Sequence, residues 1–261
     1  MNPSSEVIGK GLTSVVYAAG EGKVIKLFES WVPEPKIRRE FTITRALHAA
    51  GLPVPAVYEI AERDGRMGIV FERVDGISLF RSVKARPWRL FGAARQLAEL
   101  HAQLHGLRAP VELPTQRDQL AGWIDASDYP PERKTAAHAQ LARLPSGDAV
   151  CHGDFHPENI LLSPHGPVII DWIAGTRGHP VGDVARTSML FERANLPADA
   201  GWHMKALLKC ARTVLHRTYL KHYFRLRPGS REEIEAWRLP QMAATSAWRA
   251  ARDGFDEKMP S

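Results

Sequence analysis

The sequence predicts an α+β fold with two lobes, a small antiparallel-sheet lobe followed by a larger and mainly helical lobe. Within the first 75 residues, runs rich in β-branched and aromatic residues alternate with glycine turns, which is typical of hairpins. Further along the chain, apolar residues recur at the three- and four-residue steps of a helix. A short connector at about 72–78 separates the two patterns, so we expect lobes at 1–75 and 76–261.

Two hairpins and one helix account for the predicted N-terminal lobe. VVYAAG and KVIKLF form the first predicted hairpin, and VYEIAER and RMGIVFER form the second, each joined by a turn that contains glycine. Between them a helix is predicted from about 35 to 50, and Gly51 and the PVP that follows would end it.

The C-terminal lobe should begin with a long helix whose buried face carries Leu90, Ala94, Leu97, His101 and Leu104. A lone histidine on such a face is expected to be a hydrogen-bonded core residue. Residues 110–147 are rich in proline and charge and are expected to form a loop followed by one surface helix. Further helices are predicted near 182–194, 199–226 and 231–252.

The composition indicates a globular protein of the cytoplasm. The chain has 261 residues and a hydrophobic content of 44%, enough for a full core. The N-terminus lacks the apolar segment of a signal peptide, and no apolar run approaches the roughly 18 residues of a membrane span. Cys151 and Cys210 have no CxxC spacing, so we expect two small packing residues and neither a disulfide nor a zinc site.

The formal charge of +6 is unevenly distributed, because residues 201–230 contain seven Lys or Arg and no Asp or Glu. A solvated helix face is the first interpretation, and a field that attracts an anionic ligand is the second. We rank nucleic acid third, because the interleaved aromatic residues equally suit the buried face of an amphipathic helix. We expect no nucleic-acid or membrane partner and a monomer or weak dimer.

Residues 151–172, CHGDFHPENILLSPHGPVIIDW, contain the most informative pattern. HGDFHPEN reads as a loop between two short buried strands, and VIID as a third strand that ends at Asp171. Pairing of the flanking strands brings Asn159 and Asp171 to the same end of the sheet. Their amide and carboxylate oxygens suit Mg²⁺. Asp154 lies on the same loop and is free to accept a proton from, or orient, an attacking hydroxyl.

HGDFHPENIL followed by IIDW resembles the aminoglycoside phosphotransferase and choline-kinase-like family of small-molecule kinases, which has a protein-kinase-like fold. The resemblance implies Mg²⁺-dependent transfer of the γ-phosphoryl group of ATP, with GTP possible, to a hydroxyl of a small molecule. It implies Asp154 as the catalytic base and Asn159 and Asp171 as metal ligands. His152 would brace the loop, His156 would be exposed in mid-loop, and Asp183 would cap a helix or support the loop.

The same resemblance requires nucleotide-binding parts in the N-terminal lobe. In VIGKGLTSVVY, Gly9 and Gly11 would let the backbone approach the phosphates, and Thr13 or Ser14 would offer donors. The strand lysine that contacts the phosphates would be Lys26, with Lys23 as the alternative at the turn.

The partner of that lysine would be Glu40, with Glu34 second because we place it before the helix begins. In the connector FERVDGISL, the carbonyl of Glu72 and the amide of Val74 would bind the base, behind which Phe71 would lie, and Gly76 would form a hinge turn.

The acceptor substrate is less defined, because its site would be built from about 110–145 and 199–261. A polycationic aminoglycoside needs an acidic pocket, whereas 201–230 is wholly basic. We therefore rank a neutral or anionic hydroxylated metabolite, or an uncharged antibiotic, above an aminoglycoside. A resistance kinase and a metabolite kinase acting on a choline-, thiamine- or sugar-like acceptor both stay open.

Two other classes fit the sequence less well. A pseudokinase without transfer activity would be expected to have lost Lys26, Asp154, Asn159 or Asp171, and all four are present. A protein kinase needs a longer activation segment than the IAGTRGHPVGD that follows the metal-binding region.

Overall fold

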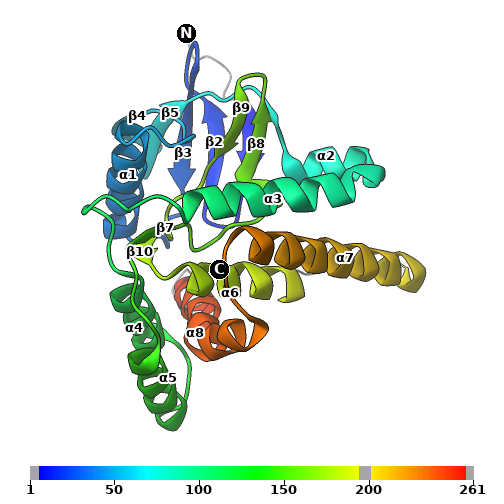
Figure 1. The fold of residues 1–261 in the computed structure, drawn as a ribbon. Helices are drawn as coiled ribbons and strands as arrows, with labels where there is room; N and C mark the ends of the chain where they lie inside the picture. The colour runs from blue at the N-terminus through cyan, green and yellow to red at the C-terminus, as the bar shows by residue number, and fades with distance from the viewer. Residues whose placement is uncertain (1–5, 194–200, 257–261) are drawn as a thin grey trace.

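The computed structural model describes residues 6–193 and 201–256, in which an antiparallel sheet and one helix lie above a group of helices (Figure 1). The predicted fold class is confirmed. The strands are β1 (Val7–Lys10), β2 (Ser14–Ala18), β3 (Lys23–Phe28), β4 (Val57–Arg63), β5 (Arg66–Glu72), β6 (Ile77–Ser78), β7 (Ala149–Cys151), β8 (Ile160–Ser163), β9 (Gly166–Ile169) and β10 (Thr176–Gly178). The helices are α1 (Glu34–Ala49), α2 (Leu79–Ala85), α3 (Leu90–Leu104), α4 (Gln116–Ala126), α5 (Pro131–Arg143), α6 (Pro180–Arg193), α7 (Trp202–Leu226) and α8 (Arg231–Asp256).

The five-stranded sheet has the order β1-β2-β3-β5-β4, and every neighbouring pair in it is antiparallel. Both predicted hairpins are present as β2–β3 and β4–β5. β3 is the central strand, with Lys26 opposite Val16 on one side and Ile69 on the other. A central strand is held by hydrogen bonds on both edges, so it gives Lys26 a well-defined position.

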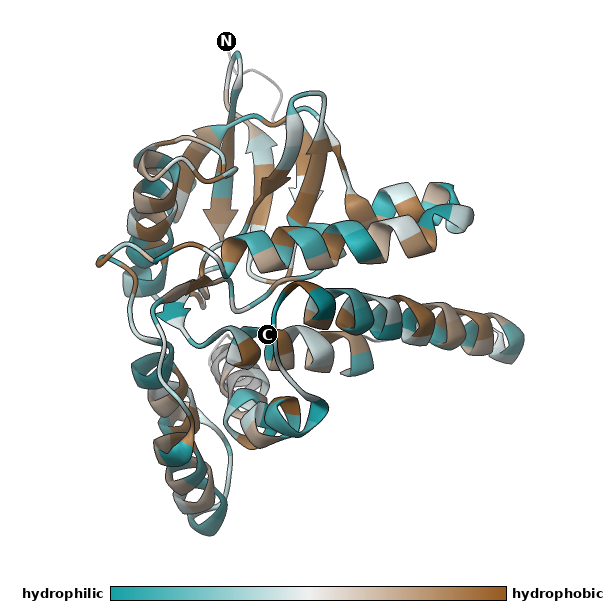
Figure 2. Ribbon diagram, in the orientation of Figure 1, coloured by the Kyte–Doolittle hydropathy of each residue, from teal (hydrophilic) through white to brown (hydrophobic). Residues whose placement is uncertain are grey.

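Helix α1 joins the sheet to the helical part of the molecule. Its Ile37 packs with Phe28 and Ile69 of the sheet, whereas its Ile43 and Leu47 belong to the large core formed mainly by the later helices. In Figure 2, hydrophobic residues accordingly recur along the strands of the sheet and along the helices, between hydrophilic ones. The apolar core therefore runs through α1, and the division into lobes at 1–75 and 76–261 stays a prediction.

The helical part is built around two packed pairs. α3 lies alongside α7, and α6 packs against α8 (Figure 1). On α3 the predicted face is buried at Ala94, Leu97, His101 and Leu104, while Leu90 is partly buried. Helix α8 also packs against α4 and α5.

Several sequence predictions need correction. Residues 110–147 form two helices and not one, because Leu120 and Ile124 give α4 a fully buried stripe against α8. The short helix α2, which Ser78 caps through its side chain, was not predicted. Helix α6 begins two residues earlier than predicted, and α8 extends to Asp256. The predicted helix positions 194, 199 and 200 lie outside the described residues.

Smaller details also differ from expectation. Cys151 is buried as predicted, but Cys210 is exposed and is not a packing residue. The last strand of the motif ends at Ile169, two residues before Asp171. Glu34 is the first residue of α1 and pairs with Arg38, so it does not precede the helix.

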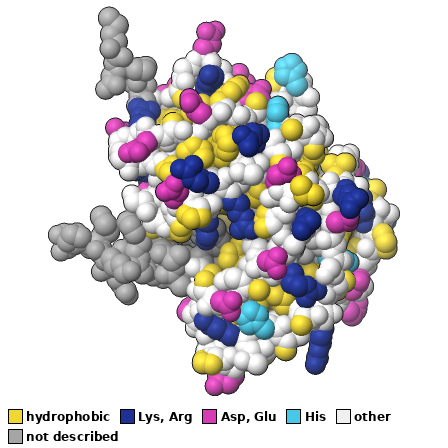
Figure 3. Space-filling view, turned by 90° about the vertical axis from the view of Figure 1, so that its left-hand side faces the viewer, with side chains coloured by type: hydrophobic (Ala, Val, Ile, Leu, Met, Phe, Trp, Pro, Cys, Tyr) yellow, Lys and Arg dark blue, Asp and Glu magenta, His cyan; other side chains and the backbone are white. Residues whose placement is uncertain are grey.

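On the face shown in Figure 3, basic, acidic and apolar side chains are interspersed. Among the helices in the described ranges, none combines the length and the apolar character needed to cross a bilayer.

Candidate active site

The catalytic-loop motif connects β7 to β8, and its glycine is required by the fold. Gly153 has φ +78°, and a Cβ atom there would lie 2.4 Å from the carbonyl oxygen of Ala174. Any other residue would combine a left-handed backbone with this clash. His152 braces the loop as expected, because its Nδ1 accepts from the Asp154 amide at 3.2 Å and its Nε2 lies 3.0 Å from the Ile170 carbonyl.

Asp183, near the start of α6, holds this loop in place through hydrogen bonds from the loop's backbone amides. Its Oδ2 accepts from the His152 amide at 2.6 Å, and its Oδ1 accepts from the Gly153 amide at 2.8 Å. The expected supporting role of Asp183 therefore agrees with its contacts. Burial by itself would raise the pKa of Asp183, but hydrogen bonds from His101 and His105 hold that pKa well below its usual range.

Two histidines, His101 of α3 and His105 at its C-terminal end, link Asp183 to α7 through hydrogen bonds. Nε2 of His101 and of His105 lie 3.1 and 3.3 Å from Oδ2 of Asp183. Nδ1 of His101 is 2.7 Å from the Tyr219 hydroxyl, and Nδ1 of His105 is 2.6 Å from that of Tyr223. These groups lie close enough to hold a metal ion. Because every ring nitrogen already has a hydrogen-bond partner, the cluster is a loop-supporting network.

This network makes stability depend on pH. Burial lowers the pKa of His101 to about 3, with the neighbouring His105 adding to the effect. The ring is therefore neutral in the folded protein but protonates near pH 6.5 in the unfolded chain. Since the unfolded state binds the extra proton, stability falls as pH falls below 6.5. Between pH 6.5 and 5 we expect about 2 kcal/mol of unfolding free energy to be lost through His101 alone.

Denaturant unfolding at pH 7, 6 and 5 measures this dependence. In His101→Gln the slope of unfolding free energy against pH should be shallower, whatever the variant's absolute stability. His165→Gln, which changes an exposed turn residue, should leave the slope unchanged. An unfolding free energy that is constant or rises from pH 6.5 to 5 would contradict the assignment.

Asp154 lies between a histidine and an arginine. Its Oδ2 is 3.4 Å from Nε2 of His156, and its Oδ1 is 3.9 Å from a guanidinium nitrogen of Arg186. Burial alone would raise the pKa of Asp154, but His156 and Arg186 outweigh it and hold the pKa at about 2. The carboxylate is therefore ionised throughout the physiological range. His156 is partly buried beside it, so the expectation of a simply exposed mid-loop residue is wrong.

Asn159 and Asp171 meet through strand pairing, as the sequence predicts. β8 pairs with β9 from Ile160 opposite Ile169, and the Ile170 amide donates to the Asn159 carbonyl at 3.0 Å. Asp171 then adopts φ +67°, a left-handed conformation that is rare for residues other than glycine. The strand thus ends in a turn that directs the carboxylate toward β3. Strained backbone of this kind is often found at functional sites.

Lys26 connects the sheet to this turn. Its Nζ donates to Glu40 of α1 at 2.7 Å and to Asp171 at 2.8 Å. The predicted Lys26–Glu40 pair is therefore present, and its side chains are 10% and 1% exposed. Burial alone would lower the pKa of Lys26, but the carboxylates of Asp171 and Glu40 outweigh it and the pKa is raised. The ammonium therefore stays charged between two carboxylates.

The predicted phosphate loop is a tight β1–β2 hairpin. Gly9 lies in β1 opposite Val16, and the Gly11 amide donates to the Ser14 carbonyl at 2.9 Å to close the turn. The carbonyl of Thr13 accepts from the Glu29 amide. The Ser14 side chain is buried, whereas Thr13 is partly buried and Gly11 is exposed.

In the connector, Glu72 ends β5 and its carboxylate accepts from the Ala56 amide at 3.0 Å, while Val74 follows in the irregular segment. Phe71 is buried in the core that the sheet shares with α1. A Cβ atom at Gly76 would lie 2.5 Å from the Leu162 carbonyl oxygen, so Gly76 permits a close approach of the connector to β8. The base-binding roles of Glu72 and Val74 stay predictions.

The donor set around Asn159 and Asp171 fits a magnesium ion. The Nδ2 group of Asn159 donates to the Asp154 carbonyl at 3.0 Å, which directs the amide oxygen away from that bond. Asp171 is 32% exposed and uses Oδ1 for Lys26. An amide oxygen and a partly exposed carboxylate are ligands of the hard type that Mg²⁺ prefers.

An N-terminal antiparallel sheet and a helical C-terminal part, with a lysine–glutamate pair beside a second aspartate, are features of the protein-kinase-like fold. Residues 5–214 match the phosphotransferase enzyme family, and the chain belongs to that family. The expected family membership is confirmed.

Two relatives each match part of the chain. Acyl-CoA dehydrogenase family member 11 of Gallus gallus is 29% identical over 180 residues, which are 60% of this chain and 23% of that protein. The chain thus spans about a quarter of the length of that relative. Aminoglycoside 3'-phosphotransferase of Streptomyces fradiae is 31% identical over 140 residues, 45% of this chain and 50% of that one.

A solved structure extends the likeness to the whole fold. The ternary complex of a thermostable D198A mutant of aminoglycoside phosphotransferase APH(4)-Ia with ADP and hygromycin B aligns with a TM-score of 0.62. The alignment covers 99% of this chain and 95% of that one at 14% identity. At this identity the likeness establishes the fold alone.

Sequence reasoning missed two residues of the site. Arg186 donates to the Gly153 carbonyl at 3.2 Å and lies beside Asp154, yet no local pattern marks it. His105 shares the Asp183 anchor with His101. The four-residue spacing of the two histidines in LHAQLH was the signal that could have found it.

Proposed function

We propose that this protein transfers the γ-phosphoryl group of ATP, with GTP as a possible alternative, to a hydroxyl of a small molecule in a Mg²⁺-dependent reaction. The observation that carries the proposal is the convergence of Lys26, Asp154, Asn159 and Asp171. Lys26 and Asp171 are 145 positions apart in the chain but 2.8 Å apart in space. Asn159 Nδ2 lies 3.4 Å from Oδ2 of Asp154.

In this proposal Asp154 receives the acceptor's proton. The hydroxyl oxygen forms its bond to the γ-phosphorus, the bond to the bridging oxygen breaks with its electrons leaving on ADP, and the proton moves to Asp154. A carboxylate with a pKa of about 2 is a weak base. It therefore orients the hydroxyl first and accepts the proton late, which suits the loose transition state of phosphoryl transfer.

The other residues position the nucleotide and balance its charge. Lys26 would contact the phosphates from β3, and Glu40 holds its side chain in place through the buried ion pair. The turn at Gly9, Gly11, Thr13 and Ser14 would cover the phosphates. Asn159 and Asp171 would hold the ion, which when bound neutralises developing charge on the phosphates.

The surroundings of Asp154 favour a neutral or anionic acceptor. Arg186 and His156 flank its carboxylate. Burial alone would lower the pKa of His156, but the carboxylates of Asp154, Glu158 and Asp171 together raise it. These positive groups offset the negative charge that would otherwise attract a polycation. This supports a hydroxylated metabolite or an uncharged antibiotic over an aminoglycoside.

A pooled-acceptor assay tests the proposal. The protein is incubated with Mg²⁺, ATP or GTP and a panel containing choline, thiamine, sugars, anionic hydroxylated metabolites, uncharged antibiotics and aminoglycosides. Mass spectrometry should find a phosphorylated neutral or anionic acceptor with the wild type and none with Asp154→Asn. A phosphorylated aminoglycoside as the main product would overturn the substrate preference but keep the reaction class. No product from any acceptor, with nucleotide and Mg²⁺ bound, would favour a pseudokinase.

A further inference from the structure

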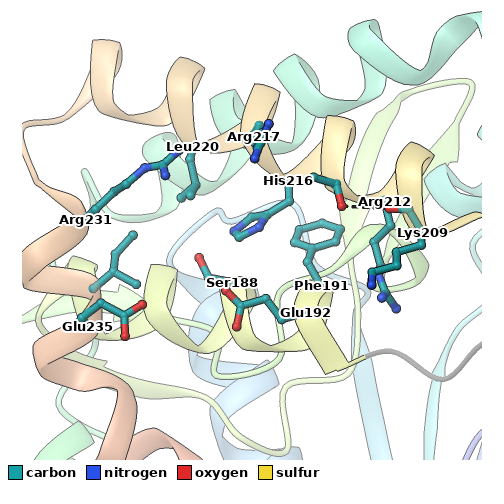
Figure 4. Close-up of a pocket in the computed structure, with 12 residues that line it drawn as sticks. Ser188, Phe191, Glu192, Lys209, Arg212, His216, Arg217, Leu220, Arg231 and Glu235 are labelled. Atoms are coloured by element: carbon teal, nitrogen blue, oxygen red, sulfur yellow. Dashed lines mark hydrogen bonds between the residues drawn. The ribbon is translucent and has the colours of Figure 1, made fainter. Parts of the chain in front are cut away.

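A pocket of about 340 Å³ lies between α6, α7 and α8 (Figure 4). Its floor contains Phe191 and Ser188 of α6, Leu220 and His216 of α7, and Ile234 of α8. The pocket is large enough for a small organic molecule. None of the residues discussed for phosphoryl transfer lines it.

Two polar atoms on the pocket floor have no hydrogen-bond partner. They are Oγ of Ser188, whose side chain is almost fully buried at 1% exposure, and Nε2 of His216. Figure 4 draws both side chains converging on the same part of the pocket. A buried polar group without a partner costs free energy, so such atoms often mark a site that a ligand completes.

The imidazole of His216 is suited to donate a hydrogen bond. Its ring stacks on Phe191 with centroids 5.5 Å apart, which fixes its orientation. Burial lowers the pKa of His216, so the neutral ring carries one N–H and one lone pair at pH 7. Ser188 and His216 can thus present two neutral donors at the bottom of the pocket.

The rim of the pocket is positively charged. Four cations line it, and the first three of them belong to α7: Lys209, Arg212, Arg217 and Arg231. The two carboxylates of the lining, Glu192 and Glu235, both accept hydrogen bonds from Arg238, which is outside the lining. The pocket therefore combines excess positive charge at the rim with uncharged donors below.

The pocket and the catalytic loop contact different sides of α6. Asp183, Arg186 and Thr187 hold the loop, the last by donating to the Phe155 carbonyl at 3.0 Å. Ser188 and Phe191 face α7 instead. The α6 residues that hold the loop are therefore different from those that line the pocket.

We propose that this pocket is a second ligand site for a compact organic anion that carries two or more carboxylate or phosphate groups. The anionic groups bind the rim cations, and one of them reaches the donors of Ser188 and His216. The proposal gives a reason for the absence of Asp and Glu from 201–230, since Lys209, Arg212 and Arg217 of that segment line the pocket. The proposal does not depend on the phosphoryl-transfer activity.

Isothermal titration calorimetry with citrate and, separately, inorganic phosphate tests the site, using the full chain at low ionic strength without nucleotide or Mg²⁺. Citrate should bind, and phosphate more weakly because it has fewer anionic groups. The double variant Arg217→Glu with Arg231→Glu should weaken citrate binding by about a hundredfold, since each lost ion pair with a charged ligand corresponds to about tenfold. The control Lys221→Glu with Arg225→Glu makes the same charge change on exposed residues of α7 outside the pocket.

Ser188→Ala separates a binding role from a structural one. Because its hydroxyl has no partner, removal should not lower the unfolding midpoint of the ligand-free protein, yet it should weaken citrate binding about tenfold. The proposal is overturned if wild type binds neither probe, if the control double variant weakens citrate binding as much as the pocket variant, or if Ser188→Ala leaves the affinity unchanged.

Discussion

Asp154→Asn is expected to lower the rate of phosphoryl transfer by about 10²- to 10⁴-fold, the usual range for loss of a catalytic base. Asparagine keeps the size of the side chain but cannot accept the proton. Nucleotide affinity should change little, because neither the contact of Lys26 with Asp171 nor the backbone bond from Ile170 to Asn159 involves the Asp154 carboxylate. Turnover on the identified acceptor, with nucleotide binding measured in parallel, checks both parts.

The matched control is Asp148→Asn, which changes the exposed aspartate directly before β7. It should retain wild-type turnover. Near-normal turnover in Asp154→Asn would remove the residue from the role of base. Loss of nucleotide binding together with turnover would instead assign Asp154 to binding or to the integrity of the loop.

Asp171→Ala should weaken the Mg²⁺ dependence of nucleotide binding. In the wild type we expect Mg²⁺ to strengthen ATP binding, and in the variant the ratio of affinities with and without Mg²⁺ should fall by about tenfold or more, equivalent to about 1.4 kcal/mol. The change also releases Lys26 from one of its two carboxylates. Binding of ATP without Mg²⁺ should therefore be unchanged or stronger, which distinguishes loss of a metal ligand from general damage.

Asp171→Asn provides the conservative comparison, because the amide keeps one oxygen ligand without its charge. It should fall between wild type and Asp171→Ala. If the ratio of affinities is the same in all three proteins, Asp171 is not a metal ligand.

The sequence was sufficient for the parts of the site that depend on local periodicity. Pairing of two short strands brought Asn159 next to Asp171. This inference required only the elements and a short connection between them. The resemblance to the kinase family, and not periodicity, pointed to Lys26 and Glu40, and the two side chains form an ion pair.

The parts that could not be predicted depend on how distant helices pack. The contacts of His101 with Tyr219 and of His105 with Tyr223 each join residues 118 positions apart, and they exist because α3 lies alongside α7. Helix crossing geometry is not encoded in any short pattern. The position of Arg186 beside the loop could not be predicted for the same reason. The helix α4 was missed because prolines flank it on both sides and its charged residues lie near its ends, which disguised its buried stripe.

The most direct test of the central claim follows the phosphoryl group in water labelled with ¹⁸O. The protein is incubated with ATP, Mg²⁺ and the acceptor found in the pooled assay, and organic and inorganic phosphate are analysed by mass spectrometry. Transfer to an acceptor hydroxyl predicts a phosphorylated acceptor that contains no ¹⁸O in its phosphoryl group, formed in equal amount to ADP. If ADP forms with ¹⁸O-labelled inorganic phosphate as its only counterpart, the phosphoryl group goes to water and the account of a small-molecule kinase is contradicted.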